Sequence, residues 1–214
     1  HNIMSSSSSK KDHLPPIWNI RPPRQTQGIN RAMLLADIQK SLLENPVCLL
    51  NPPTPDTPGQ GLSTLARDYA YQQADQYQMV WWIDCTIKSV TTVQYTQICT
   101  ALDMLHNQNK RHFHSIADTQ ERLQTHAGWL LIFDNATDID FIHTLLPENI
   151  SGHVIITTPD IPEDQSIPHI TIPPMNPTQL NGHYETMKLS HTIAPSVLNG
   201  NILALDILYA HHTT

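Results

Sequence analysis

The sequence predicts an α/β fold: a five-stranded parallel sheet with helices on both faces. Five short apolar runs alternate with segments whose apolar residues recur every three or four positions, as they do in helices. The runs are continuous and do not alternate with polar residues, which indicates strands buried on both faces. The expected strands are residues 47–50, 79–85, 129–134, 153–158 and 169–173.

One helix is expected on each side of the first strand. Before this strand, apolar residues occur at helical spacing up to Asn45-Pro46, where the helix should stop: Met33, Leu34, Leu35, Ile38, Leu42 and Leu43. After the strand, a second apolar stripe consists of Leu62, Leu65, Ala66, Tyr69 and Ala70. Both patterns are typical of amphipathic helices.

Capping residues predict three further helices. The expected caps are, in chain order, Thr91-Thr92, Ser115 with Asp118, and Thr137 with Asp140. The first of these helices should run to Leu105, with Ile98, Leu102 and Leu105 facing inward. The second should run to His126.

The length and composition fit one domain with a full core, because the chain has 214 residues and is 39% hydrophobic. No apolar run approaches the roughly 20 residues that cross a bilayer, so no membrane span is expected. The first residues lack the apolar centre of a secretory signal: HNIMSSSSSKKDHLPP. We expect disorder in this serine-rich stretch, with His1–Ile3 as an expression remnant before a natural start at Met4.

Charge is unevenly distributed along the chain. Residues 1–122 hold eleven Lys and Arg against ten Asp and Glu, whereas residues 123–214 hold only Lys188 against nine acids. Nucleic-acid binding normally needs clustered Lys and Arg, and the sequence has no such cluster beyond Lys10-Lys11 and Arg21/Arg24. We therefore expect no nucleic-acid partner.

Cysteines and histidines indicate neither disulfides nor a metal centre. Cys48, Cys85 and Cys99 lie in apolar stretches without paired spacing, which is typical of buried free thiols in a reducing compartment, so a cytoplasmic location is expected. The closest approaches to a metal motif are His112-x-His114 and His211-His212. Neither has the Cys/His spacing of a structural site, so no metal site is expected.

The segment after the first strand has the outline of a phosphate-binding loop that leads into a helix: TPDTPGQGLSTLARDYA, residues 54–70. Gly61-Leu62-Ser63 stands where the motif G-x-x-x-x-G-K-S has glycine, lysine and serine. Asp134 ends the third strand, where an aspartate could hold the magnesium ion of a nucleotide. Ligands of parallel sheets bind beyond the carboxyl ends of the strands, which is where both features should lie.

Several segments resemble, in the same order, the NB-ARC class of signal-transduction ATPases, over residues 18–212. They are RPPRQTQGINR, STLARDYAYQQADQYQMVWWIDC, GWLLIFDNATD, GHVIITTPD, IPPMNP and NGNILALDILYA. The resemblance implies an additional-strand P-loop NTPase fold with a degenerate Walker A motif. It implies a disordered segment at 1–17, a nucleotide-binding domain at 18–175 and a truncated helical lid at 176–214.

The resemblance also implies which nucleotide contacts remain: Gly59, Gly61, Ser63 and Asp134, with Ser63 and Asp134 at the magnesium positions. Leu62 occupies the lysine position and Asp56 the position of the first glycine, so a cation is lost and an anion is gained. Several prolines near the turn cannot donate a backbone N–H to phosphate: Pro52, Pro53, Pro55 and Pro58. Once freed from phosphate, Leu62 is expected to turn inward with Leu65.

Other positions depart from the family pattern in the same direction. Pro159 replaces the sensor arginine, and Ile202 replaces the proline that would lie against adenine. The G-R-E of the linker reads Gly28-Ile29-Asn30, although Arg31 follows. These losses predict that no catalytic residue, metal ion or nucleotide cofactor remains.

Two functions from different classes stay open. The favoured one is a non-catalytic protein-interaction or adaptor module. The alternative is a signalling switch that binds ADP or ATP with magnesium weakly and hydrolyses it little or not at all. An unrelated enzyme using Asp84, Cys85 or His153 has less support, because the sequence shows no nucleophile and base pair among them.

A truncated lid should leave apolar surface uncovered, so a protein partner or self-association is expected at residues 178–214. Other apolar residues that could form such a surface are instead expected in the core: Trp18, Ile20, Trp81, Trp82 and the helix at 202–209.

Overall fold

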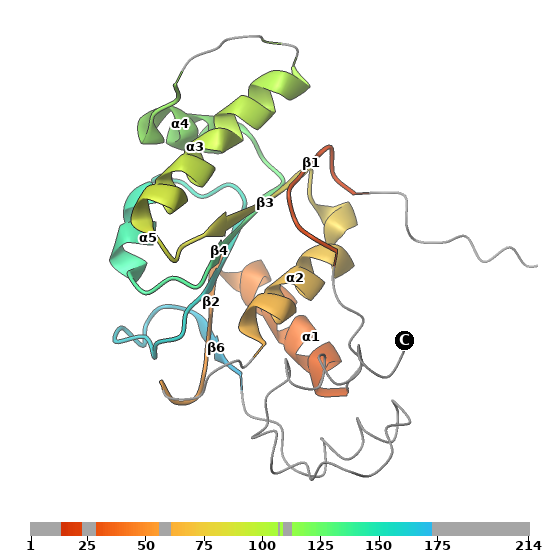
Figure 1. Ribbon diagram of the computed structural model, residues 1–214. Helices are drawn as coiled ribbons and strands as arrows, with labels where there is room; N and C mark the ends of the chain where they lie inside the picture. Colours follow the sequence, from red (N-terminus) through yellow and green to blue (C-terminus); the bar gives the residue numbers. More distant parts are fainter. Residues whose placement is uncertain (1–13, 23–28, 56–60, 107, 109–112, 173–214) are drawn as a thin grey trace, which may run out of the picture.

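The structure is a computed structural model that describes residues 14–22, 29–55, 61–106, 108 and 113–172. Figure 1 shows its elements: β1 (Ile17–Trp18), α1 (Ile29–Glu44), β2 (Val47–Asn51), α2 (Leu62–Gln72), a 3₁₀ turn (Ala74–Gln76), β3 (Met79–Asp84), α3 (Lys88–Leu105), α4 (Ile116–Thr125), β4 (Trp129–Asp134), α5 (Ile139–Leu145), β5 (His153–Thr157) and β6 (His169–Thr171). The predicted N-terminal disorder and helical lid, with the partner surface at 178–214, lie outside the described residues. Among the described helices, none is both long and apolar enough to cross a bilayer.

The strands form one parallel sheet of six strands in the order β1-β3-β4-β5-β2-β6. The five predicted strands and their parallel pairing are confirmed. Strand β5 lies between β2 and β4, so the strand before the loop and the strand that ends in Asp134 are separated by an additional strand. This is the order expected for additional-strand P-loop NTPases.

Strand β1 was not predicted, and it changes the burial of its neighbour. It pairs with Met79 and Val80 on the outer edge of β3 and contains only two residues. The side chain of Asn19 continues the pairing, since it accepts the N–H of Trp82 at 2.6 Å and donates to its carbonyl at 3.0 Å. Because so short a strand covers little of β3, Trp81 and Trp82 are only half-buried, and their expected core position is wrong in part.

The segment around β1 packs onto α2, and of its two residues predicted in the core, Ile20 is buried and Trp18 is half-buried. Ile20 is buried, and the half-buried ring of Trp18 meets Tyr71 edge-on with 4.9 Å between the centroids. The hydroxyl of Tyr71 and the indole N–H of Trp18 both donate to the carbonyl of Ile20, at 3.1 and 3.0 Å.

Helices cover both faces of the sheet (Figure 1). On one face, α3, α4 and α5 bury Tyr95, Ile98, Leu102, Leu123, Ile142 and Leu145. On the other face, α1 and α2 bury Ile38, Leu42, Leu65, Tyr69 and Ala70. Two residues of the α1 pattern lie on its solvent side instead, because Met33 is 64% and Leu43 is 78% exposed.

Helix α3 begins at Lys88, three residues before its predicted cap. Thr91 is therefore buried in the first turn, where its hydroxyl donates to the last carbonyl of β3 at 3.0 Å. Ile98 and Leu102 face the core as predicted, whereas Leu105 is 48% exposed at the end of the helix. The prediction for Leu105 was wrong.

The predicted cap of α4 is confirmed, and the predicted cap of α5 is wrong. Ser115 Oγ accepts the N–H of Asp118 at 3.1 Å, and the Asp118 carboxylate accepts the N–H of Ser115 at 2.7 Å, which confirms the capping box. Helix α5 is capped by Asp138 and not by the predicted Thr137. Asp138 accepts the N–H of Phe141, three positions on, at 2.9 Å, which is a usual geometry for a helix cap.

Replacing Ser115 by alanine is expected to lower the free energy of unfolding by about 1 kcal/mol, since the N–H of Asp118 loses its acceptor. Urea denaturation of the natural chain, Ser115→Ala and Ser115→Thr measures the effect. The threonine variant keeps a hydroxyl and should retain most of the stability. Equal stability of all three proteins would show that the cap contributes nothing.

The three cysteines are free and buried, as predicted. Burial raises the pKa of the Cys48 thiol to about 11 and that of Cys85 to about 12. Both thiols are therefore protonated at neutral pH and are poor nucleophiles.

Candidate functional site

The carboxyl ends of β2, β4 and β5 meet at one edge of the sheet. Ser63 lies in the first turn of α2, Asp134 ends β4 and Thr157 ends β5. Ser63 Oγ donates to Asp134 Oδ1 at 2.6 Å, and Thr157 Oγ1 donates to the same oxygen at 2.7 Å. The structure thus brings together the two predicted magnesium positions, which are 71 residues apart in the chain.

Thr157 was missing from the predicted site. It is 2% exposed, and its hydroxyl accepts the backbone N–H of Asn135 at 2.8 Å. Asn135 has a φ of 60°, in the left-handed region that few residues other than glycine adopt, so Thr157 fixes a tight turn directly after Asp134. The sequence shows only a hydroxyl residue at the end of an apolar strand. That this hydroxyl reaches Asp134 can be inferred only once β5 is known to lie beside β4.

Gly61 forms the entrance to α2. Its φ of 70° and ψ of 25° are left-handed, and its carbonyl accepts the N–H of Leu65 at 2.8 Å. The first N–H groups of α2 have no acceptor within the helix, as at any helix start. The other predicted loop residues, Gly59, Asp56 and Pro58, lie outside the described residues.

Leu62, the residue predicted at the lysine position, contributes to the core. It is half-buried and packs against the apolar cluster under α1 and α2, next to Leu65, which is 3% exposed. The prediction that Leu62 turns inward with Leu65 is confirmed. This position provides apolar contact where a nucleotide-binding loop would provide a cation.

No family model and no curated protein matches the chain. Among solved structures, it is similar to a Signal Transduction ATPase with Numerous Domains (STAND) from Pyrococcus horikoshii that has a tetratricopeptide repeat sensor. The TM-score is 0.52 at 16% identity, over 88% of this chain and 28% of that one. The strand order agrees with this likeness. The chain has a P-loop NTPase fold.

Two further structures are similar at lower scores. One is the ORC2 protein of Aeropyrum pernix in ADPNP and ADP complexes, with a TM-score of 0.49 and 14% identity over 92% of this chain and 63% of that one. The other is C. elegans PCH-2, with a TM-score of 0.38 and 10% identity over 75% and 45%. The chain spans less than two thirds of the length of each of these proteins.

In this P-loop NTPase fold, the arginines between α1 and α2 have internal partners. Arg31 Nε binds the carboxylate of Asp68, and the guanidinium of Arg67 lies 5.4 Å from the ring centroid of Trp82. Burial raises the pKa of Asp68, while the charge of Arg31 lowers it by less. Arg31 therefore joins the two helices α1 and α2.

The carboxyl edge of the sheet carries negative charge. Asp84 and Asp134 end neighbouring strands in direct register, and Asp160 follows β5. Pro159, which was predicted at the sensor-arginine position, is half-buried and uncharged. An anionic ligand at this edge would meet the carboxylates that end β3 and β4.

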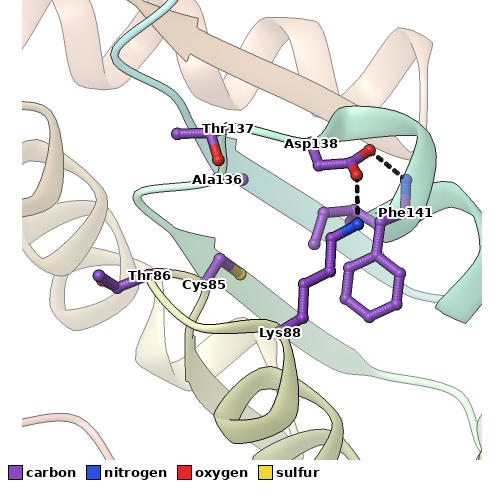
Figure 2. A pocket seen from close by; sticks show the side chains of 8 residues that line it. Cys85, Thr86, Lys88, Ala136, Thr137, Asp138 and Phe141 are labelled. Atoms are coloured by element: carbon purple, nitrogen blue, oxygen red, sulfur yellow. Dashed lines mark hydrogen bonds and ion pairs between the residues drawn. The ribbon is translucent and has the colours of Figure 1, made fainter.

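A small pocket lies beside this edge, between the start of α3 and the turn before α5 (Figure 2). Its volume is about 50 Å³, whereas ligand pockets usually measure about 300–1,000 Å³. Lys88 extends across it, with Nζ 2.6 Å from Asp138 Oδ2 and 5.0 Å from the ring centroid of Phe141. This pocket is too small for a nucleotide, and its lysine is already paired.

Replacing Lys88 by alanine is expected to raise the pKa of Asp138, because the hydrogen bond from Lys88 is the main cause that lowers it. The N–H of Phe141 still donates, so the pKa should stay below its ordinary value. With a depressed folded-state pKa, the carboxylate stabilises the fold above the unfolded pKa, and this contribution is lost as pH falls through the folded pKa.

NMR titration of the side-chain carboxyl carbons measures the change. Asp118 is the internal control, since its pKa is lowered mainly by Ser115 and should not move. An Asp138 pKa that is unchanged in Lys88→Ala would contradict the pairing.

Asp84, Cys85 and His153 do not form a catalytic site. Cys85 follows β3 at the carboxyl edge, whereas His153 begins β5 at the opposite edge. His153 Nδ1 lies 2.8 Å from the hydroxyl of Tyr77, and burial lowers the pKa of this histidine. The nucleophile and base pair that an enzyme would need is therefore not formed by these three residues.

Of the histidines that came closest to a metal motif, His114 lies in the part of the chain that the structure describes. Its Nε2 is 3.0 Å from Asp103 Oδ2, and Arg122 binds the other oxygen of Asp103 at 2.5 Å. These contacts join α3 to α4. His112, His211 and His212 lie outside the described residues, and within the described part no group of three or more His, Cys, Asp or Glu side chains is arranged to hold a metal ion.

Proposed function

We propose that the chain is a non-catalytic P-loop NTPase-like domain that has lost nucleotide binding and works as a protein-interaction or adaptor module. The observation that supports this most strongly is Leu62. At the position that needs a lysine for the β- and γ-phosphates, the chain has a half-buried apolar side chain. A triphosphate bound there would lose its hydrating water, contact the apolar side chain of Leu62 and find no positive charge to offset its own.

The surrounding charges support the same proposal. Asp84 and Asp134 end β3 and β4, and Asp160 follows β5, at the same edge of the sheet as the start of α2. Two like charges 4 Å apart repel by about 4 kcal/mol at an effective dielectric constant near 20. The start of α2 provides the equivalent of only about half a positive charge, which is small beside a nucleotide charge near −4.

The two predicted magnesium positions lie near the spacing that a single ion requires. The Ser63 and Asp134 oxygens are 2.6 Å apart, and neighbouring ligands of an octahedral Mg²⁺ ion lie about 3 Å apart. If the Ser63 and Asp134 side chains moved apart by a few tenths of an ångström, their oxygens would have the spacing of two ligands of one ion. However, Mg²⁺ in such sites is held by one or two carboxylates together with substrate phosphates, so the protein residues alone would bind it weakly.

The contact between Ser63 and Asp134 is the one observation that favours the alternative function. A weak switch that binds ADP or ATP with magnesium would keep this pair and would hydrolyse nucleotide slowly or not at all. The alternative must explain how phosphate binds without the lysine and without the sensor arginine.

Titration calorimetry of the natural chain with ATP and with ADP, each in the presence of Mg²⁺, tests the proposal. We expect no binding heat up to millimolar nucleotide and no release of phosphate over hours. Micromolar binding of either nucleotide, abolished by Ser63→Ala, would replace the adaptor with the switch. Measurable hydrolysis that Asp134→Asn removes would show that the chain is an enzyme.

A further inference from the structure

Two histidines end neighbouring helices on one face of the sheet. His106 is the C-cap of α3, and His126 is the C-cap of α4. About one turn before them, Asp103 of α3 binds Arg122 of α4, so the two helices end side by side (Figure 1). The two imidazole rings meet there, with 6.0 Å between their centroids and an angle of 66° between their planes.

The backbone determines which nitrogen of each ring carries the proton. Nδ1 of His106 lies 2.8 Å from the carbonyl oxygen of Leu102, and Nδ1 of His126 lies 2.8 Å from that of Arg122. A carbonyl oxygen only accepts hydrogen bonds, so Nδ1 is the protonated nitrogen in both rings. In the neutral rings Nε2 therefore holds a lone pair, and no hydrogen bond among the described residues uses either Nε2.

We propose that Nε2 of His106 and Nε2 of His126 together bind one divalent transition-metal ion of the class Cu²⁺, Ni²⁺ or Zn²⁺. Imidazole suits these ions, and a metal-bound histidine usually donates its other N–H to a carbonyl or carboxylate, as both rings do here. An ion about 2.0–2.1 Å from each Nε2 would put the two ring centroids roughly 4.5–6.4 Å apart, depending on the angle at the metal. The observed 6.0 Å lies within this range.

The electrostatic surroundings of the pair favour a cation. The ends of α3 and α4 each provide the equivalent of about half a negative charge. The positive charge of Arg122 is offset by Asp103, which is 3% exposed and also contacts His114. The formal net charge of the chain is −7, which draws cations to its surface.

The pair is accessible, and one of its members is held firmly. The carbonyl of His126 accepts the indole N–H of Trp129 and the hydroxyl of Ser151, both at 2.9 Å. His126 is half-buried and His106 is exposed, so an ion can reach the pair from solvent. Little of the binding free energy is then lost in ordering His126.

The histidine pair is separate from the predicted magnesium positions. His126 lies shortly before β4 begins, whereas Asp134 ends this strand, so the two places are at opposite ends of β4. The inference therefore does not depend on whether nucleotide binds. No metal site was expected from the spacing of histidines along the chain, because spacing does not show that the ends of two helices meet.

Titration calorimetry with Cu²⁺, Ni²⁺, Zn²⁺ and Mg²⁺ tests the proposal. One ion per chain should bind saturably at the pair, most tightly as Cu²⁺, whereas Mg²⁺ prefers oxygen ligands and should not bind there. His106→Asn and His126→Asn are the test variants, because the asparagine amide can replace the Nδ1 donor but provides no Nε2. Each should weaken Cu²⁺ binding at least tenfold, and the double variant should weaken it little further, since the two ligands act together.

His169→Asn is the matched control. Nδ1 of His169 also lies 2.8 Å from a carbonyl oxygen, that of Ile167, but no second imidazole meets this ring among the described residues. Its Cu²⁺ binding should equal that of the natural chain. Circular dichroism must show that the variants fold.

NMR of the imidazole nitrogens tests the geometry in the natural chain. Without metal, His106 and His126 should both show an unprotonated Nε2, and Zn²⁺ should shift the two Nε2 signals together. Zn²⁺ should also raise the urea midpoint of the natural chain but not that of either asparagine variant, because the ion binds the folded pair.

Three results would overturn the inference. Saturable binding that neither asparagine variant weakens would place the ion elsewhere, and binding that only one variant weakens would leave a site with a single histidine. A natural chain that binds none of the three transition metals saturably would refute the site itself. If a variant does not fold, NMR of the natural chain decides, since a shift of one Nε2 signal alone contradicts a shared ion. Binding of ATP with Mg²⁺ would refute the loss of nucleotide binding and leave the histidine pair untouched.

Discussion

Replacing Gly152 by alanine is expected to lower the free energy of unfolding by about 3 kcal/mol, at the upper end of ordinary overpacking. A Cβ at this position would lie 2.5 Å from the carbonyl oxygen of Trp129 and 2.5 Å from its ring atom Cε3. Trp129 cannot move away easily. It is 1% exposed, and its indole N–H donates to the carbonyls of Leu123 and His126 at 2.9 Å.

Gly128→Ala is the matched control for this effect, since Gly128 directly precedes Trp129 in the chain. Gly128 has a φ of +74°, so alanine is strained there, but its Cβ would meet only the flexible side chain of Gln78 at 3.4 Å. We expect a smaller loss, about 1 kcal/mol. Urea denaturation compares the variants, and a Gly152→Ala loss no larger than that of Gly128→Ala would contradict the close packing.

The position of Gly152 connects this packing to the site at the other end of the strand. Gly152 precedes β5, and the register sets Leu130 of β4 opposite His153 of β5. A shift of β5 at this end would also move Thr157, which holds Asp134 through a 2.7 Å hydrogen bond. Folded Gly152→Ala should therefore show changed amide shifts at Asn135, whose N–H depends on Thr157.

The main strands and helices could be predicted from the sequence because their signal is local. Runs such as residues 129–133 are apolar without interruption, which is typical of a strand covered on both faces. The capping box at Ser115 is equally local, since its two hydrogen bonds join residues three apart. The inward turn of Leu62 was predicted from its place in a helical stripe and from the absence of a phosphate-binding lysine at this position.

Features that depend on distant contacts were missed. Strand β1 has two residues and no periodicity, and it exists because the outer edge of β3 accepts it. Thr157 joins the site because β5 lies beside β4, which no pattern within β5 reveals. The exposure of Leu105 and of Trp82 depends on how far neighbouring elements extend over them.

The candidate site was predicted in its residues more than in its geometry. Ser63 and Asp134 were expected at one edge, and they meet there through a direct hydrogen bond. The sequence could assign Leu62 to the lysine position, but only the packed structure shows the apolar contacts that this residue makes. Leu62 thus has a structural role of its own, so replacing it by lysine should lower the stability of the fold.

Restoring the motif with Leu62→Lys, Asp56→Gly and Pro159→Arg is expected to raise the affinity for ATP with Mg²⁺ by about a hundredfold or more over the natural chain. The triple variant gains two cations and loses one anion near the phosphates. If two of these charge changes each contribute about 1.4 kcal/mol to the binding free energy after screening by solvent and salt, each raises the affinity about tenfold. The lysine also removes part of the burial of Leu62, so a stability loss of about 1 kcal/mol should accompany the gain.

Titration calorimetry of the triple variant should be paired with a quadruple variant that adds Ser63→Ala. If nucleotide binds in the predicted place, this change removes the hydroxyl that reaches both Mg²⁺ and Asp134, and most of the gained affinity should vanish. If the triple variant still did not bind ATP, the lack of positive charge would not be what prevents nucleotide binding. The prolines Pro52, Pro53 and Pro55 would then be the next cause to test, because each removes a backbone donor that no restored lysine can replace.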